Sequence, residues 1–181
     1  MNRVELELAI ITAAQAIGHN QVLVMGSQAI LGSFDEYQLP ERATASQEVD
    51  IAPLEDDDRE SLATKIDAAA GEWSPFDQSH GFYIQGVSVR TAYLPEGWAT
   101  RVIEVRPHAH PGIGGLCLEA HDLCAAKMAR NDQKDREFVA ALVAAEIIST
   151  EKLLSRIRMI VDPRFTPHSQ RAALSFVRSL R

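Results

Sequence analysis

The sequence is poor in cysteine, and it lacks any long apolar run. Two cysteines, Cys117 and Cys124, occur in 181 residues, and their spacing is not that of a zinc ribbon or a redox motif. A disulfide framework is therefore excluded, and we interpret both residues as buried thiols. No stretch is long and apolar enough to cross a bilayer, so we expect no membrane-spanning segment.

The rest of the composition is that of an ordinary globular protein. Hydrophobic residues make up 46% of the chain and charged residues 24%, and no disorder-prone tract dominates. A chain of 181 residues is long enough to bury a single core. The first residues include acids that a secretory signal lacks, so we expect a cytoplasmic location.

Charge is divided unevenly along the chain. Residues 151–181 carry a net charge of +5, which leaves −12 for the preceding 150 residues. An acidic body repels nucleic acid, so general DNA binding is not expected. The basic tail either docks an RNA end or an acidic partner protein, or simply forms the solvated faces of two amphipathic helices. We favour solvated faces for Arg156, Arg158, Arg171 and Arg178, because charged helix faces usually contact only water.

Periodicity and turn residues predict that helices and strands alternate in the first two thirds of the chain. Residues 81–94 alternate in two short runs with a break near Gln85 and Gly86, which predicts a β-hairpin and hence antiparallel strands. From Glu119 onward the pattern is helical. The other predicted helices cover 4–17, 27–33 and a segment that starts after the acids at 56–58, and the other predicted strands cover 21–25, 47–53 and 101–106.

Two carboxylates alternate with apolar residues in the predicted strand 47–53. Glu48 and Asp50 then project from one face, while Val49 and Ile51 pack on the other. Two carboxylates on one face can hold magnesium, which takes oxygen ligands and usually shares them with substrate phosphates. The alternative is a strand end with two solvated acids, because such triplets are common.

Gly26 and Ser27 directly follow the first predicted strand. Glycine permits a positive φ and a close approach of the backbone, and Ser27 is a suitable first residue for the short helix. Free amides at such a helix start can hold a phosphate. The pair also fits an ordinary strand-to-helix turn, so only its combination with Glu48 and Asp50 indicates magnesium-dependent phosphoryl chemistry.

This combination resembles the nucleotidyltransferase fold superfamily, whose pattern is a Gly-Gly or Gly-Ser turn, a spacer, and acid–apolar–acid on the next strand. The spacer is longer here, and Glu48 stands where Asp is more frequent. A closer resemblance, to a bacterial family of uncharacterised nucleotidyltransferases (DUF6036-like), extends over most of the chain. That family is grouped with the toxin-type nucleotidyltransferases of abortive-infection systems. The segments that carry the closer resemblance are 74–76, 80–83, 94–98, 117–119, 121–127 and 134–138.

The resemblance implies an α/β fold: a nucleotidyltransferase-like mixed sheet flanked by helices at 1–118, and a C-terminal helical region at 119–181 packed on it. It implies transfer of a nucleoside monophosphate from a nucleoside triphosphate to a hydroxyl acceptor. The site residues it implies are Glu48 and Asp50 for Mg²⁺, Gly26 and Ser27 for phosphate, and Lys127 and Asp135 on later helices.

The local sequence leaves the roles of three residues open. Lys127 either faces the sheet and neutralises triphosphate oxygens, or is simply solvated. Asp135, between two basic residues near a helix start, is either catalytic or part of a surface ion pair. Glu104, in the strand 101–106, is either the base that activates the acceptor hydroxyl or an ordinary charge on the wet side of an antiparallel strand.

The predicted function is therefore magnesium-dependent nucleotidyl transfer, and the acceptor is left open among a transfer RNA end, a protein side chain and a small molecule. A toxin role with an antitoxin partner rests on the family grouping alone. The alternative is a catalytically silent scaffold that binds a partner protein or RNA through the basic C-terminal helices. A zinc centre matches no common spacing, although ligands are available in His108, His110, Cys117, His121 and Cys124.

Overall fold

The structure is a computed structural model that describes residues 1–57 and 59–180. Within these residues a mixed five-stranded sheet has the strand order β3-β2-β1-β5-β4. β1 pairs in antiparallel fashion with β2 and in parallel with β5, while β3 is parallel to β2 and β4 antiparallel to β5. The predicted α/β fold is thereby confirmed. The strands are β1 (Gln21–Val24), β2 (Glu48–Pro53), β3 (Tyr83–Gly86), β4 (Ile103–Val105) and β5 (Gly114–Cys117).

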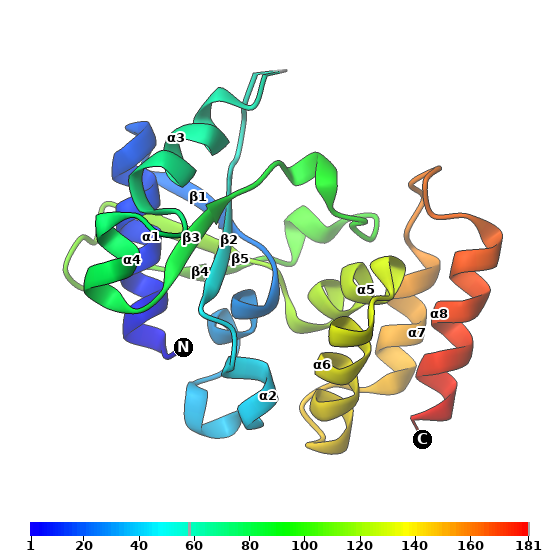
Figure 1. Ribbon diagram of the computed structural model, residues 1–181. Helices are drawn as coiled ribbons and strands as arrows, with labels where there is room; N and C mark the ends of the chain where they lie inside the picture. The colour runs from blue at the N-terminus through cyan, green and yellow to red at the C-terminus, as the bar shows by residue number, and fades with distance from the viewer. Residues whose placement is uncertain (58, 181) are drawn as a thin grey trace.

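Helices are arranged in two groups around this sheet. In Figure 1, α1, α3 and α4 gather on one side, and α5 to α8 form a second group on the other. No helix in the described part of the chain has the length and hydropathy of a membrane span. The α-helices are α1 (Arg3–Ile17), α2 (Glu41–Thr44), α3 (Ser61–Ala70), α4 (Pro75–His80), α5 (Ala120–Arg130), α6 (Gln133–Ala144), α7 (Thr150–Arg158) and α8 (Pro167–Ser179), and the 3₁₀ segments are η1 (Ser27–Gly32), η2 (Glu36–Gln38), η3 (Val89–Thr91) and η4 (Trp98–Thr100).

Local signals explain where the first elements begin and end. Asn2 and Glu5 form a capping box at the start of α1, and Gly18 ends the helix in the left-handed conformation. Asp56 accepts hydrogen bonds from backbone amides at the start of α3, as expected for an acid there. Asp58, predicted with it, lies outside the described residues. Cys117 and Cys124 are buried free thiols, as predicted, and burial raises the pKa of both.

The hairpin predicted for 81–94 is wrong. β3 ends at Gly86, and the chain continues into η3 instead of returning along β3. Gly86 packs against α3 so closely that a Cβ there would lie 1.9 Å from the carbonyl oxygen of Ala63. Ser88 then accepts a hydrogen bond from the Arg90 amide and begins the 3₁₀ turn. The segment after β3 therefore leaves the sheet, and β3 is a parallel edge strand.

The C-terminal helices are tied to the preceding segment by a buried carboxylate. Asp122 in α5 is fully buried and forms ion pairs with Arg101 at 2.7 Å and with Arg156 at 2.9 Å. The prediction that Arg156 lies on a solvated helix face is therefore wrong, because helical spacing does not reveal a buried partner. Arg158, Arg171 and Arg178 are exposed, as predicted.

Candidate functional site

β2 places two carboxylates on one face of the sheet. Val49 and Ile51 are fully buried, while Glu48 and Asp50 alternate with them and are only partly covered, as predicted. In the neighbouring strand, Tyr83 pairs with Glu48, and its hydroxyl donates a hydrogen bond to Glu48 Oε2 at 2.8 Å. Gln85 lies opposite Asp50 in the register of the same two strands, so its side chain belongs to this face as well. The predicted hairpin did not pair β3 with β2, so it gave no sign that Tyr83 and Gln85 lie beside the two carboxylates.

The turn after β1 brings the backbone against Asp50. Gly26 has φ +58° and ψ −167°, a conformation that is strongly unfavourable for other residues. The Met25 amide donates to the Asp50 carbonyl at 2.8 Å, and a Cβ on Gly26 would lie 1.7 Å from Asp50 Oδ2. The predicted positive φ and close approach are both confirmed. Ser27 begins η1, a 3₁₀ helix, directly beside this contact.

Gly26→Ala is expected to destabilise the protein by roughly 2 kcal/mol or more, because strained φ/ψ alone costs about 1–3 kcal/mol. The added methyl group also displaces the Asp50 carboxylate, so any affinity of this carboxylate for magnesium is expected to fall in the variant. Urea unfolding and magnesium titration measure the two effects. Gly112→Ala is the matched control, since no atom lies within 4 Å of its Cβ position. Equal stability of Gly26→Ala and Gly112→Ala would contradict the conclusion that position 26 requires glycine.

α5 presents two cations that share one buried carboxylate. Asp135 of α6 is 1% exposed and accepts a hydrogen bond from Lys127 Nζ at 3.0 Å. It also accepts hydrogen bonds from Nε and Nη2 of Arg130, each at 2.7 Å. The alternatives of a solvated Lys127 and a surface Asp135 are therefore wrong. Asn131 ends α5 in the left-handed conformation and α6 begins directly after Asp132, so the chain reverses and Asp135 meets the last turn of α5.

Electrostatics differ sharply between the two aspartates of the cleft. Burial, then the charge of Glu48 and its hydrogen bond, raise the pKa of Asp50 from 3.8 to about 6, although Lys127 and Arg130 oppose the shift. Burial also acts to raise the pKa of Asp135, but hydrogen bonds from Arg130 and the charge of Lys127 outweigh it and lower that pKa. Asp135 is thus a satisfied carboxylate, whereas Asp50 lacks a countercharge of its own.

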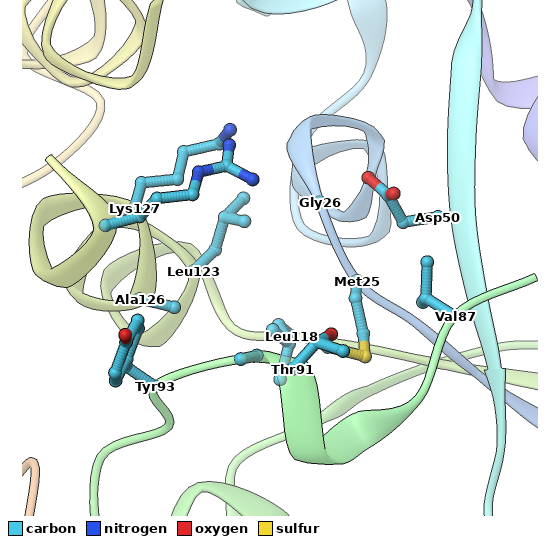
Figure 2. A pocket seen from close by; sticks show the side chains of 12 residues that line it. Met25, Gly26, Asp50, Val87, Thr91, Tyr93, Leu118, Leu123, Ala126 and Lys127 are labelled. Atoms are coloured by element: carbon cyan, nitrogen blue, oxygen red, sulfur yellow. The ribbon is translucent and has the colours of Figure 1, made fainter. Parts of the chain in front are cut away.

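A cleft with two adjoining hollows separates the sheet from α5 and α6. Asp50, Lys127 and Arg130 line both hollows. In Figure 2, Lys127 extends from α5 toward Gly26 and Asp50. The first hollow has about 570 Å³ of empty space and the second about 1130 Å³. The first is lined mainly by apolar side chains, among them Met25, Val87, Leu118, Leu123 and Ala126, and the second by polar ones, among them Ser27, Arg42, Ser46, Glu48 and Lys134.

The structure does not bring Glu104 to this cleft. It lies on β4, which two strands separate from β2, and it is not among the residues that line either hollow. Its carboxylate pairs with Arg106 at 2.6 Å and is 38% exposed. Conversely, sequence reasoning missed Arg130, although its place three residues after Lys127 on one helix could have revealed it.

The described residues do not provide the ligands of a zinc centre. Among residues 1–57 and 59–180, no group of three or more His, Cys, Asp or Glu side chains is arranged to hold a metal ion. His121, one of the candidate ligands, instead bonds through Nδ1 to Glu119 at 2.8 Å, and its Nε2 accepts from the Ser149 amide at 3.1 Å. His121 therefore joins the start of α5 to the start of α7.

Comparison with known proteins gives one informative result. The searches among curated proteins and among solved structures found no match. A family model described as "Nucleotidyltransferase of unknown function (DUF6036)" matches residues 5–174. Because the match extends over nearly the whole chain, including β2, the Gly26 turn and the Lys127–Asp135 pair, the protein belongs to this nucleotidyltransferase family.

Proposed function

We propose that the protein is a magnesium-dependent nucleotidyltransferase, which moves a nucleoside monophosphate from a nucleoside triphosphate to a hydroxyl acceptor. The observation that carries the proposal is the opposition of charges across the cleft. Glu48 and Asp50 lie on the sheet, and Lys127 and Arg130 lie on α5. A magnesium triphosphate is complementary to such a pair of walls, because it presents a cation to one wall and anionic oxygens to the other.

The donor set on the sheet fits a hard divalent cation. Glu48 and Asp50 share a face, and the pKa of Asp50 is raised because it is buried beside a second carboxylate. Magnesium is usually held by one or two carboxylates, water and substrate phosphates, so this pair is sufficient. A bound magnesium ion would supply positive charge that stabilises the attacking and leaving oxygens.

The remaining residues bind and orient the nucleotide. Lys127 Nζ uses one donor on Asp135 and keeps the others for triphosphate oxygens. In this proposal the Gly26 amide, which lies at the apolar hollow, and the Ser27 hydroxyl, which lies at the polar hollow, contact phosphate oxygens. The acceptor oxygen attacks the α-phosphorus in line, the bond to pyrophosphate breaks, and the hydroxyl proton passes to solvent. The role of Glu104 as the base that activates the acceptor hydroxyl stays a prediction, and the reaction proposed here does not use it.

Calorimetric titration with each nucleoside triphosphate, with and without magnesium, tests the proposal. We expect at least one nucleotide to bind only with magnesium, and Asp50→Asn to weaken that binding more than tenfold, because an amide cannot replace a carboxylate ligand. Glu151→Gln, at an exposed acid of α7, is the matched control and should bind like the wild type. If no nucleotide binds, the silent scaffold becomes the better account.

The toxin role and the antitoxin partner rest on the family resemblance alone, and the cytoplasmic location rests on the composition of the first residues. In this proposal the acceptor is a transfer RNA end, a protein side chain or a small molecule, since one fold serves all three. The toxin role, the antitoxin partner and the cytoplasmic location stay predictions.

A further inference from the structure

We infer that Arg130 binds the phosphate oxygens of a pyrophosphate unit in the polar hollow. The inference rests on the proposed function and deepens it, because it assigns the hollow to the leaving group of the nucleotide. Arg130 is not part of the strand and turn pattern, and it lies one turn after Lys127 on α5, where it lines the polar hollow.

The guanidinium of Arg130 is held in place and still has a free edge. Nε and Nη2 both donate to Asp135 at 2.7 Å. Nη1 has no hydrogen-bond partner within the described residues, and the side chain is 61% exposed. A guanidinium fixed along one edge loses little freedom when its other edge binds a phosphate, and its planar fork suits phosphate oxygens.

The charges around Arg130 leave a positive surplus on this wall. Lys127 and Arg130 share one buried carboxylate, so Asp135 neutralises only one of the two cations. Asp132 also lies 3.5 Å from Arg130 Nε, but this pair is 61% and 68% exposed, and solvent weakens such contacts. The surplus charge therefore remains available to an anion in the cleft.

The polar hollow offers further groups for an anion of this size. Besides Lys127 and Arg130, Lys134 and the hydroxyl-bearing residues Ser27 and Ser46 line it. Arg42 lines it too but is paired with Glu137, and the acids of the hollow are Glu48, Asp50, Asp132 and Asp135. Lys134 is exposed. With a metal ion on Asp50, a pyrophosphate unit in this hollow has positive charge on two sides.

An ion pair that serves stability alone would not produce this arrangement. Lys127, at 8% exposure, already supplies the cation that a buried carboxylate requires. Arg130 adds two hydrogen bonds to the same carboxylate, yet 61% of its side chain stays exposed, which a purely structural ion pair does not require. Its firm attachment and its place at the junction of both hollows are instead those of a ligand-binding side chain.

The test is calorimetric titration of inorganic pyrophosphate, in the presence of magnesium, into the full chain. Arg130→Met is expected to weaken binding by roughly 10- to 100-fold, the range that corresponds to loss of charge-assisted hydrogen bonds. Arg130→Lys, which keeps the charge but loses the fork, should recover only part of this loss. Arg171→Met, at an exposed arginine of α8, is the control and should bind like the wild type. Melting temperatures verify that every variant is folded.

The outcomes separate this inference from the proposed function. Equal affinity of Arg130→Met and the wild type overturns the inference, and so does a wild type that binds no pyrophosphate. Nucleotide binding that survives Arg130→Met unchanged overturns the inference while the proposed function stands. Pyrophosphate binding that depends on Arg130, without binding of any nucleotide, supports the anion site and removes the support for nucleotidyl transfer.

Discussion

Asp50→Asn is expected to raise the melting temperature of the metal-free protein at pH 7.5. Burial beside Glu48 raises the pKa of Asp50 from 3.8 to about 6, so the ionised carboxylate opposes folding at neutral pH. At about 1.4 kcal/mol per pKa unit, removal of the charge is worth about 2–3 kcal/mol. For a domain of this size that corresponds to a rise of roughly 4–12 °C. Magnesium should stabilise the wild type and not the variant.

The direction of the pH dependence identifies Asp50 as the cause. Between about pH 4 and pH 6 the folded protein holds a proton on Asp50 that the unfolded chain has lost, so wild-type stability falls as pH rises through this window. The advantage of Asp50→Asn should therefore be absent at pH 4 and complete above pH 6. Thermal unfolding, followed by circular dichroism at four pH values, measures the difference in melting temperature between the variant and the wild type.

Glu119 provides a control of opposite sign. Burial acts to raise its pKa, but hydrogen bonds from His121 and Lys152 outweigh burial and lower the pKa to about 2. Ionised Glu119 therefore stabilises the fold above pH 4.5, and this contribution is lost as pH falls toward 2. Glu119→Gln should lower the melting temperature at neutral pH. For Asp50 itself, a variant Asp50→Asn that melts below the wild type at pH 7.5 would refute the conclusion that the ionised Asp50 carboxylate opposes folding.

Asp135→Ala is expected to destabilise the protein by about 3–5 kcal/mol, the cost of leaving a buried charge without its partner. Lys127 is 8% exposed on its side chain, and Asp135 is the carboxylate that it contacts. The Phe138 ring, 4.7 Å from Lys127 Nζ, compensates only part of the loss. Urea denaturation gives the free energy of unfolding directly.

Two further variants show whether the buried charge is the cause. Asp132→Ala removes an acid that is 68% exposed, and whose side chain makes no cap hydrogen bond, so it should change stability by less than about 0.5 kcal/mol. Lys127→Met combined with Asp135→Leu should recover much of the loss, because apolar residues can replace a buried pair. If Asp135→Ala costs no more than Asp132→Ala, the pair does not stabilise the fold.

The part of the site that depends on local pattern could be predicted from sequence. Alternation along a strand determines that Glu48 and Asp50 share a face, and a glycine after a strand indicates the close backbone approach at Gly26. The local sequence allows Lys127 either to face the sheet or to be solvated, and only the structure decides between the two. Local pattern therefore predicts one wall of the cleft well and the opposite wall only in part.

The rest depends on how distant segments meet, which periodicity does not reveal. Glu104 lies on a strand as predicted, but β5 separates β4 from β1, and that strand order removes it from the cleft. The burial of Asp135 follows from the reversal between α5 and α6. Arg156 has the helical spacing of a solvated residue, yet its partner Asp122 is buried in another helix.

The ion pairs of Asp122 with Arg101 and Arg156 have a consequence for how ligands enter. They fasten the segment before β4 to α5 and α7, and Tyr93 in that segment lies 5.0 Å from the Arg164 guanidinium beyond α7. These contacts hold the segment that carries Tyr93, a residue that lines the apolar hollow, against the C-terminal helices. We therefore expect a ligand to enter the apolar hollow through rotation of the long side chains that line it, Lys127 and Arg130, and not through movement of this segment.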